Sequence, residues 1–489
     1  MKQIDMETIR DLEMPQAVLM ERAALCTVEE ILAGGFSLSR VIVIAGCGNN
    51  GGDGVCIARI LKEKGICSEV FVLGTPSSDS ECAHQIRIAQ KTGVSVTEGS
   101  EEDCIVYLGS SAPSLLVDAI FGVGLNRAID EKLCELIRYL NAMECGRVSV
   151  DIPSGVNATT GAIEGEAVKS DLTVTYGAYK TGQFLYPGHT YCGQIRMHPI
   201  GIRQDYAYET EDLYALEDTD LPPVNRKPDS HKGTFGKLLL IAGSAEVGGA
   251  AVLSAKAAFH AGIGMVRVFT HQNNRDILLQ AVPEAMVTTY DDELTSLPEA
   301  MQWADVIAIG PGISTSDLAG SILRTVLSGS RLPLILDADA INLIAEGRKS
   351  YGFPAEDGRE LILTPHLKEF SRLTGLGVSE IKADPVSACR DFAGKNHCTC
   401  VLKDARTVIS DGTTTYLNLS GNAGMATAGS GDVLLGLVAA LRAQGLKPLA
   451  AAAYGAYIHG RAGDAAAKIF GQSGMTASDL TGQFKEYLQ

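Results

Sequence analysis

The sequence lacks long apolar runs and has no excess of positive charge. No apolar run approaches the roughly 20 residues that a membrane-spanning helix needs, and the N-terminal stretch MKQIDMETIRDLEMP is too acidic for a signal peptide. We therefore expect a cytoplasmic protein that makes no membrane contact. The formal net charge of -17 argues against nucleic-acid partners, because these require basic surfaces. The expected ligands are small molecules.

Disulfide and transition-metal motifs are also missing. The 12 cysteines never stand in a C-x-x-C spacing, and the nine histidines form no H-E-x-x-H pattern. Cys398 and Cys400 lie in an apolar run that is typical of a buried strand. We therefore expect reduced, mostly buried cysteines and no transition-metal site. The sequence does not exclude a site in which oxygen atoms hold a hard cation.

What the chain does contain is a repeated strand-turn-helix pattern. A length of 489 residues predicts two or more domains. Residues 41–54 combine an apolar strand, a glycine turn and a helix start. The alternation continues through 81–92, 115–122, 131–143 and 148–155. This pattern predicts a parallel α/β sheet. Ahead of it, apolar positions at helical spacing over 7–33, interrupted at Pro15, predict two helices that form a cap.

Three predicted strands lead into polar or glycine-rich segments. Asp53, Asp118 and Asp151 belong to the segments NNGGDG, DAIFGVGLNRA and DIPSG. Because ligands of parallel sheets bind beyond the carboxyl ends of the strands, we expect these carboxylates to share one crevice. Such a crevice suits a phosphate-bearing ligand together with a cation. The alternative is that each Asp simply forms a turn.

The first turn also matches a dinucleotide-binding fingerprint. Gly46, Gly48 and Gly51 stand in the G-x-G-x-x-G spacing. The acidic residue that should end the second strand is missing, because Glu69 stands at the start of EVFVLG instead. We therefore do not expect a redox Rossmann site.

A second series follows a break in the pattern. Residues 217–236 are rich in proline, charge and glycine, which is typical of a linker. A strand, a glycine-rich turn and an alanine-rich helix come next, over 236–264. Further strand-helix segments occupy 305–314, 334–344 and 361–370, and residues 399–412 predict a hairpin. The chain therefore contains two predicted α/β domains.

The stretch from Asn418 to Gly436, NLSGNAGMATAGSGDVLLG, is where we place the main chemistry. Its glycines leave backbone N–H groups free to approach an anion, and the apolar segment after Asp432 predicts a buried helix whose N-terminus faces the loop. The helix dipole would keep Asp432 ionised and able to accept a proton from an alcohol beside a bound phosphate. The alternative is a glycine-rich turn in which Asp432 is a plain N-cap.

In combination, these motifs resemble those of the bifunctional NAD(P)H-hydrate repair enzymes. The motifs are GNNGGDG, DAIFGVG, DIPSG, GPG, TPH, LKDART and GNAGMATAGSGDVL, and they span nearly the whole chain. The resemblance implies a Rossmann-like NAD(P)H-hydrate epimerase domain over 1–215, a linker over 216–235, and a larger ribokinase-like dehydratase domain over 236–489. The epimerase interconverts R and S forms of hydrated NADH or NADPH. The dehydratase restores the S form to NADH or NADPH at the expense of ADP.

The resemblance also implies roles for individual residues of the first domain. The hydrated nucleotide would bind Asn49, Asn50, Gly51, Gly52, Asp53, Gly122, Val123, Gly124, Leu125, Asn126, Arg127, Ala128 and Asp151. Asp151 would also be the catalytic acid/base. A potassium ion would be held by Asn50, Asp118 and Ser154, which agrees with the oxygen-rich crevice expected from the strand ends.

In the second domain the resemblance implies a substrate site beside an adenine-nucleotide site. The substrate positions are Ala250, Gly312, His366 and the catalytic Asp432. The nucleotide positions are Lys403, Asp404, Ala405, Arg406, Thr407, Asn422, Gly429, Ser430 and Gly431. His366 either orients the ligand or has a structural role. Leu367 and Lys368 replace the usual Pro-Gly of the family, and Asp404 replaces a usual glycine.

The expected chemistry is phosphoryl transfer to a hydroxyl group that is otherwise a poor leaving group. Asp432 would deprotonate the hydroxyl, and the glycine loop and Mg²⁺ would steady the phosphate of ADP. We also expect a homo-oligomer. The alternative is a ribokinase-like kinase of a vitamin-precursor alcohol with a non-catalytic N-terminal binding domain, since a Rossmann-like fold alone does not dictate activity.

Overall fold

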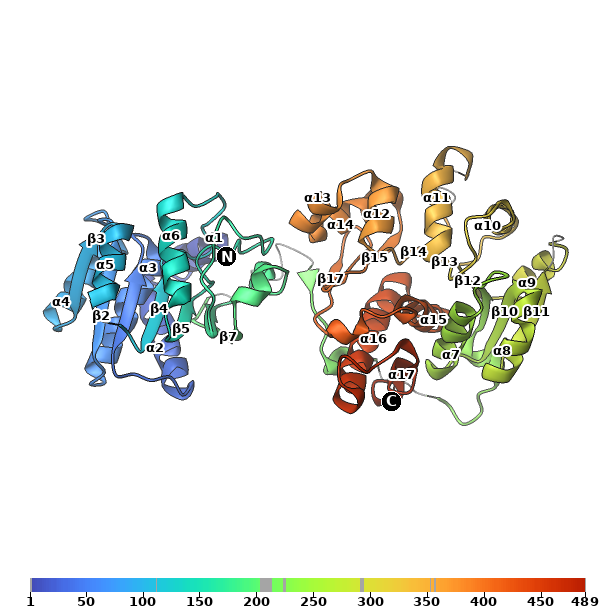
Figure 1. Ribbon diagram of the computed structural model, residues 1–489, viewed down its shortest axis with the longest axis horizontal. Helices are drawn as coiled ribbons and strands as arrows, with labels where there is room; N and C mark the ends of the chain where they lie inside the picture. Colours follow the sequence, from blue (N-terminus) through green and yellow to red (C-terminus); the bar gives the residue numbers. More distant parts are fainter. Residues whose placement is uncertain are drawn as a thin grey trace. The chain divides into compact units, whose positions relative to one another are not determined.

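A computed structural model describes residues 2–110, 112–202, 213–222, 226–290, 294–351, 353–355 and 358–488. The chain divides into two compact units, Met1–Glu211 and Asp212–Gln489 (Figure 1). The second unit includes β8 (Leu213–Tyr214), which pairs with a strand of that unit and precedes the predicted linker at 216–235. The sheet of the first unit is parallel and that of the second is mainly parallel, as the sequence predicts.

The first unit contains a seven-stranded parallel sheet with the order β3-β2-β1-β4-β5-β6-β7. The strands are β1 (Val41–Ala45), β2 (Ser68–Leu73), β3 (Ser95–Gly99), β4 (Leu115–Ala119), β5 (Gly146–Val150), β6 (Leu172–Tyr176) and β7 (Gln194–His198). The chain winds in one direction from β1 to β3 and in the other from β4 to β7. The strand order therefore reverses between β1 and β4, and a ligand crevice is expected at their carboxyl ends.

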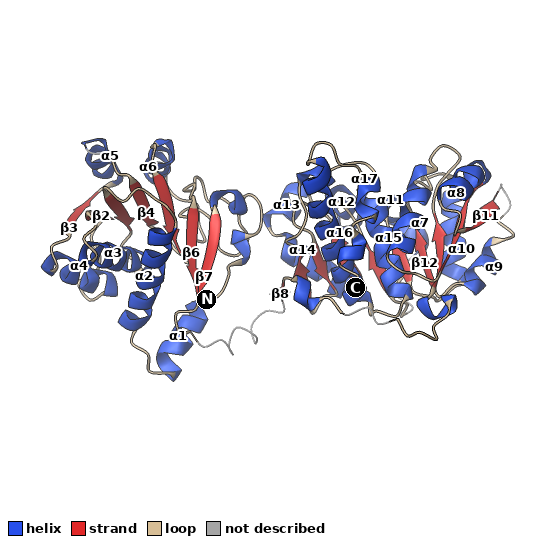
Figure 2. Ribbon diagram, turned by 90° about the horizontal axis from the view of Figure 1, so that it is seen from below, coloured by secondary structure: helices blue, strands red, loops and turns tan. Residues whose placement is uncertain are grey.

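Helices cover both faces of this sheet (Figure 2). They are α1 (Lys2–Asp11), α2 (Gln16–Ala33), α3 (Asn49–Glu63), α4 (Glu81–Lys91), α5 (Glu101–Ser110) and α6 (Glu131–Ala142). Val41 and Val43 of β1 pack with α2, α3 and α4, whereas Ile42 and Ile44 pack with α5 and α6. The break at Pro15 is confirmed. The expected cap is wrong for α2, because this helix buries its apolar face in the core of the sheet.

The second unit contains a ten-stranded sheet with the order β11-β10-β9-β12-β13-β14-β15-β16-β17-β8. Its strands after β8 are β9 (Lys237–Ile241), β10 (Met265–His271), β11 (Met286–Tyr290), β12 (Val306–Ile309), β13 (Leu334–Leu336), β14 (Leu361–Leu363), β15 (Thr399–Leu402), β16 (Val408–Ser410) and β17 (Thr415–Leu417). The strands from β11 to β15 are parallel, and β15, β16 and β17 are antiparallel neighbours. The hairpin predicted over 399–412 is therefore confirmed.

The core of the second unit is formed around α15. The helices are α7 (Gly249–His260), α8 (Arg275–Ala281), α9 (Leu297–Trp303), α10 (Asp317–Gly329), α11 (Ala338–Tyr351), α12 (Leu367–Thr374), α13 (Val378–Ala383), α14 (Pro385–Asn396), α15 (Ser430–Ala443), α16 (Pro448–Phe470) and α17 (Ala477–Thr481). Every residue of α15 from Val433 to Leu441 is buried, so the predicted buried helix is confirmed. Gly436 lets α15 approach α7 closely, because a Cβ there would lie 2.1 Å from the Ser254 carbonyl oxygen.

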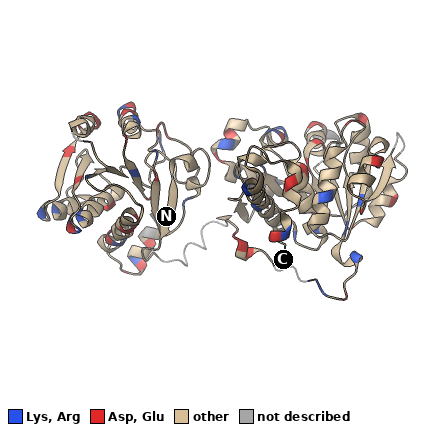
Figure 3. Cartoon of the chain, turned by 60° about the horizontal axis from the view of Figure 1, so that its bottom comes forward, with Lys and Arg blue, Asp and Glu red and all other residues tan. Residues whose placement is uncertain are grey.

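The surfaces of the units carry charges of both signs. Figure 3 shows Lys and Arg positions interspersed with Asp and Glu positions along the ribbons of both units. In the described part of the chain, no helix combines the length and apolarity needed to cross a membrane. The 12 cysteines are free thiols, and most of them are buried, as expected.

Candidate active sites

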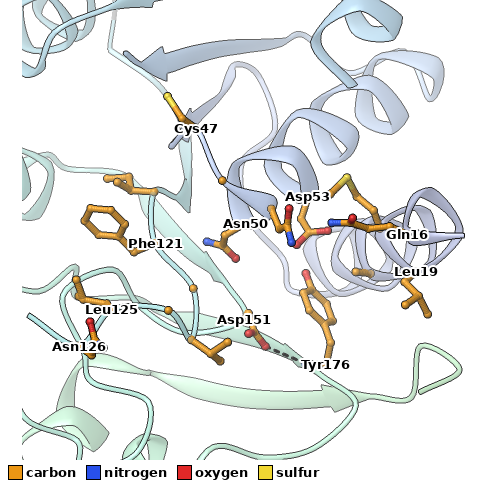
Figure 4. A pocket seen from close by; sticks show the side chains of 18 of the residues that line it. Gln16, Leu19, Cys47, Asn50, Asp53, Phe121, Leu125, Asn126, Asp151 and Tyr176 are labelled. Carbon is orange, nitrogen blue, oxygen red and sulfur yellow. Dashed lines mark hydrogen bonds between the residues drawn. The ribbon is translucent and has the colours of Figure 1, made fainter. Parts of the chain in front are cut away.

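The first unit contains a cavity of about 830 Å³ at the carboxyl ends of β1, β4 and β5 (Figure 4). The predicted residues that line it are Asn49, Asn50, Asp53, Gly122, Val123, Gly124, Leu125, Asn126, Arg127, Ala128 and Asp151. The structure therefore brings two of the three strand-end aspartates, Asp53 and Asp151, to one cavity. The cavity also has an apolar wall from α2, where Leu19 and Met20 contribute.

Gly51 and Gly52 are predicted ligand contacts, but both are buried in the packing of α3. A Cβ at Gly51 would lie 1.8 Å from the Gly46 carbonyl oxygen, and one at Gly52 would lie 2.7 Å from the Met20 methyl carbon. These glycines let α3 start close to β1 and α2. They shape the cavity by this close approach, and neither of them lines it.

Asp118 lies beneath the cavity, and the prediction that it shares the crevice is wrong in this respect. Its carboxylate is 3 % exposed and accepts hydrogen bonds from the Ser154 hydroxyl (2.6 Å), the Ser154 N–H (2.8 Å) and the Ser149 hydroxyl (2.7 Å). Burial nevertheless raises the pKa of Asp118, because these donors are neutral and only partly offset the loss of solvation. The Ser154 hydroxyl in turn accepts the Phe121 N–H at 2.9 Å, which joins the loops after β4 and β5.

Asp151 combines strained backbone with one well-bonded carboxylate oxygen. Its φ of 67° is in the left-handed region, which non-glycine residues adopt rarely and which often marks a functional site. Oδ1 accepts a hydrogen bond from the Tyr176 N–H at 3.2 Å (Figure 4) and one from the Thr175 hydroxyl at 3.0 Å. It also accepts one from the Lys180 ammonium group. Asp151 is therefore a fixed carboxylate in the cavity wall.

In the second unit, the glycine loop leads into α15 as predicted. Gly429, with φ of 89°, is the N-cap residue, and as a glycine it offers no side chain to cap the helix. Asp432 stands in the first turn of the helix, so the alternative in which Asp432 is itself the N-cap is wrong. The Asp432 carbonyl oxygen accepts the Ser254 hydroxyl at 2.9 Å, which ties the start of α15 to α7.

The Asp432 carboxyl group has a raised pKa, although the helix dipole alone predicts a firmly ionised carboxylate. Burial is the main cause, and the nearby charge of Asp337 adds to it, while Lys403 acts in the opposite direction. Together they raise the pKa of Asp432 to about 6. The rise in pKa caused by desolvation is thus larger than the decrease expected from the dipole at the helix N-terminus. The carboxyl group is still mostly ionised at neutral pH, and it exchanges its proton close to neutrality.

An ion pair lies beside the glycine loop. Lys403 Nζ, at the end of β15, donates to Asp337 Oδ1, at the end of β13, across 2.7 Å. A Cβ at Gly431 would lie 3.4 Å from Lys403 Nζ. The predicted nucleotide residues Lys403 and Gly431 are therefore close neighbours. Glu369 is also buried here, and burial raises the pKa of its carboxyl group.

The hairpin turn after β15 is joined to the glycine loop. Arg406 donates to the Leu419 carbonyl oxygen at 3.0 Å, and the Asn418 N–H donates to the Thr407 carbonyl oxygen at 2.8 Å. Asp404 and Ala405 are exposed in the same turn. The structure thus brings the predicted nucleotide segment 403–407 to the loop that begins at Asn418.

The glycine loop is held from its other side by α16. Asp464 of that helix accepts the Gly421 N–H and the Asn422 side-chain amide, both at 3.0 Å. His459 lies one turn earlier, with Nε2 at 3.4 Å from the Ser430 hydroxyl. Burial lowers the pKa of His459 to about 4, so this ring is neutral at physiological pH. The predicted residues Asn422 and Ser430 are therefore both held by hydrogen bonds to α16.

The predicted substrate positions Gly312 and His366 follow strands β12 and β14, and Ala250 is in the first turn of α7. Gly312, with φ of 62°, lies against α7, where a Cβ would be 3.4 Å from the Ala250 methyl group. His366 pairs with Lys403 in a short parallel bridge. His366 is also the N-cap of α12, since its Nδ1 accepts the N–H groups of Lys368 and Glu369 at 3.1 Å. This cap is the structural role that the sequence left open for His366.

The sequence did not predict several residues of both sites. Lys180, Tyr176 and Gln16 in the first unit, and Asp337 and Glu369 in the second, were not predicted. Asp337 had a signal, because it directly follows the apolar run LIL in the same way as the aspartates of the first unit. No sequence pattern pointed to Lys180, because this residue lies in an irregular segment after Gly177.

Comparison with known proteins bears on both units. A family model described as NAD(P)H-hydrate dehydratase matches residues 238–485, and one described as YjeF-related protein N-terminus matches residues 16–182. A bifunctional NAD(P)H-hydrate repair enzyme of Moorella thermoacetica is 35% identical over 98% of this chain and 94% of its own length. The corresponding enzyme of Escherichia coli is 36% identical over 90% of this chain and 83% of its own length.

Solved structures resemble the second unit. A ribokinase-like superfamily protein from Enterococcus faecalis shares 32% identity with a TM-score of 0.51, covering 57% of this chain and 97% of its own. An ADP/ATP-dependent NAD(P)H-hydrate dehydratase from Bacillus subtilis, co-crystallised with ATP and Mg²⁺, shares 28% identity with a TM-score of 0.50. It covers 56% of this chain and 97% of its own. The ribokinase-like fold expected for this unit is confirmed.

Proposed function

The chain belongs to the family of bifunctional NAD(P)H-hydrate repair enzymes, and from this membership we propose that its two units perform two steps of one repair. The first unit interconverts the R and S epimers of hydrated NADH and NADPH. The second unit dehydrates the S epimer back to NADH or NADPH at the expense of ADP. The observation that carries the proposal is one partly buried carboxylate in each unit, Asp151 and Asp432.

In the second unit, Asp432 is the base. The hydrated ring carries a hydroxyl group on the carbon next to the ring nitrogen, and hydroxide is a poor leaving group. Asp432 takes the hydroxyl proton while the oxygen attacks the terminal phosphoryl group of ADP, and AMP leaves. The C–O bond then breaks and releases inorganic phosphate as the ring nitrogen donates its electron pair. Loss of a proton from the adjacent carbon restores the dihydronicotinamide.

The N-terminus of α15, the loop before it and Lys403 supply the positive charge for this step. Backbone N–H groups at Gly429 and Gly431 form an anion site of the kind found at helix N-termini, whereas the Ser430 N–H donates to the Thr427 carbonyl oxygen at 3.4 Å. Lys403 adds a cation beside it. We propose that segment 403–407 and Asn422 bind the rest of the adenine nucleotide.

The second unit also has ligands suited to Mg²⁺. The buried carboxylates of Asp337 and Glu369 lie near Lys403, and Mg²⁺ in nucleotide sites is bound through one or two carboxylates together with phosphate oxygens. These residues therefore fit the ion. When bound there, it would neutralise negative charge on the phosphates.

In the first unit, Asp151 is the acid/base at the carbon that changes configuration. Asp53, the segment Asn49–Asn50 and the segment 122–128 of the cavity would hold the dinucleotide around it. The donor set of Asn50, Asp118 and Ser154 fits a potassium ion. These three side chains offer oxygen atoms, which are the ligands of hard cations, and Asp118 is a buried carboxylate whose hydrogen-bond donors are neutral. A bound cation would offset that buried charge.

The test uses chemically hydrated NADH containing both epimers. The protein is incubated with the mixture, Mg²⁺, K⁺ and ADP, and the near-ultraviolet absorbance of NADH is followed while chromatography separates the epimers. We expect both epimers to be consumed and NADH to return. Omitting ADP should leave NADH unrestored but should still equilibrate the epimers. If NADH does not return in the complete mixture, the proposed dehydration is wrong.

A further inference from the structure

Lys180 is a buried cation beneath the cavity of the first unit. It precedes the short helix η1 (Thr181–Gln183) and is only 4 % exposed. Its ammonium group donates to Asp151 Oδ1, to the Thr175 hydroxyl at 2.7 Å and to the Tyr176 carbonyl oxygen at 3.0 Å. An ammonium group has three N–H donors, and all three have acceptors here. Lys180 therefore has no donor left for a ligand in the cavity.

The two carboxylate oxygens of Asp151 differ in the hydrogen bonds that they accept. Oδ1 accepts hydrogen bonds from Lys180, the Thr175 hydroxyl and the Tyr176 N–H. Among the described residues, none donates a hydrogen bond to Oδ2. Because Asp151 lines the cavity, Oδ2 is the oxygen available to a bound molecule (Figure 4).

Gln183 connects the backbones of the two residues. Its side-chain amide donates to the Asp151 carbonyl oxygen at 2.8 Å and accepts the Lys180 N–H at 2.9 Å. Gln183 is fully buried. One short segment therefore fixes both the strained backbone of Asp151 and the ammonium group that holds its carboxylate.

We propose that Lys180 is a positioning residue for the acid/base of the first unit. It holds the Asp151 carboxylate in one rotamer through Oδ1, balances its charge, and thereby presents Oδ2 to the reacting carbon. This inference rests on the epimerase function proposed for the first unit. Lys180 acts through Asp151 and does not touch the substrate.

The surroundings of Asp151 show why a cation is needed. The titratable and charged groups that line the same cavity are Cys47, Asp53, Arg127, Asp130 and Tyr176. Asp53 and Tyr176 come from the walls next to Asp151, and Tyr176 is buried, with its pKa raised well above 10 by desolvation, so its phenol is neutral. Arg127 is exposed in the loop after β4. Lys180 is thus the buried cation in contact with Asp151, and removing one partner of a buried ion pair is strongly unfavourable.

The main experiment compares Lys180→Met with Lys169→Met in the full chain. Lys169 is an exposed lysine of the same unit, so its variant is the matched control and should keep the wild-type rate within about twofold. Steady-state epimerisation of the R hydrate is measured by chromatography. For Lys180→Met we expect kcat to fall about a hundredfold or more while KM changes less than about threefold, because the lost contact acts on the base and not on the substrate. An unchanged kcat, or a loss confined to KM, would overturn the proposal.

A milder pair of variants covers the case in which Lys180→Met fails to fold, as judged by circular dichroism and thermal melting. Thr175→Val removes a neutral donor to Oδ1 and should lower kcat about tenfold at constant KM. Lys180→Arg keeps the charge but replaces the compact ammonium group by a planar fork, and it should retain more activity than Lys180→Met. If Thr175→Val has the wild-type kcat, or Lys180→Arg is no better than a folded Lys180→Met, the positioning role is wrong.

Chemical rescue gives a readout that a purely structural role would not move. Methylammonium chloride added to Lys180→Ala should restore part of kcat, whereas tetramethylammonium chloride at equal concentration should not, because it has no N–H donor. No difference between the two salts would contradict the inference. The wild type serves as the reference for the proposed function itself: if it does not accelerate R-to-S conversion above the uncatalysed rate, the epimerase proposal fails, independently of Lys180.

Discussion

The two units present the same side chain, an aspartate, in opposite electrostatic settings. Asp151 in the first unit is paired with a buried ammonium group and held by two further donors on one oxygen. Among the residues that the structure describes, Asp432 in the second unit has no such pair and faces the charge of Asp337, with Lys403 committed to Asp337 instead. Burial, with the charge of Asp337 adding to it, raises the pKa of Asp432 to about 6.

This difference suits the two reactions proposed. A base that removes a hydroxyl proton while phosphoryl transfer proceeds benefits from a pKa near the working pH, and burial next to another carboxylate provides it. A group that acts on a carbon centre from one direction benefits from a fixed carboxylate, and the ion pair with Lys180 provides that. The cation in each site is thus used differently: it orients the base in the first unit and contributes to the anion site in the second.

The largest expected effect is that of Asp432→Asn. The amide cannot accept the hydroxyl proton, so we expect dehydration of the S hydrate to fall about a hundredfold to ten-thousandfold. Epimerisation in the first unit should stay at the wild-type rate and is the internal control for folding and concentration. Normal recovery of NADH by this variant would rule out Asp432 as the base.

Asp151→Ala should have the converse effect. The S hydrate should be repaired at the wild-type rate, while the R hydrate persists and disappears only at the rate of its spontaneous epimerisation. Chromatography of the two epimers over time measures this, and the apparent loss is expected to be at least about a hundredfold once the uncatalysed rate is subtracted. Equal consumption of both epimers at the wild-type rate would remove Asp151 from the mechanism.

A smaller effect is expected from pH. Because the pKa of Asp432 is raised from 3.8 to about 6, the carboxyl group gains a proton as pH falls through 6, and the base is lost. The kcat/KM of dehydration, which reports the free enzyme, should therefore be constant above about pH 7 and fall about tenfold per pH unit well below 6. The residual activity of Asp432→Asn is the control, and it should not show this decrease below pH 6. A wild-type profile that stays flat down to pH 5 would show that Asp432 is not the titrating base.

The smallest effect is expected for Asp404→Gly. The family resemblance of the segment LKDART implies a glycine at the position of Asp404, and the Asp404 side chain is exposed in the turn after β15. Exposed charges are well solvated and contribute little, so we expect the preference between ADP and ATP to change less than about twofold. Michaelis constants for both nucleotides at low and high salt test this. A shift toward ATP that fades with salt would instead make Asp404 a selector of nucleotide charge.

The sequence by itself determined the two α/β units, the break at Pro15, the hairpin after Thr399 and the buried helix after the glycine loop. These features depend on local patterns, because apolar periodicity, proline and glycine act over a few residues. It also placed the catalytic candidates at strand ends and at a helix start, where parallel sheets and helix N-termini bind ligands.

Only the tertiary structure decided which of these residues meet and how they are charged. Lys180 is 29 residues from Asp151 in the sequence, and it reaches the carboxylate because β5 and β6 are neighbours in the sheet. Asp118 is buried beneath the cavity although its motif resembles those of Asp53 and Asp151. The raised pKa of Asp432 depends on burial and on Asp337, which follows β13 and lies far from α15 in the sequence. Contacts between distant segments and the solvation they remove are properties of the packed chain, so no local pattern encodes them.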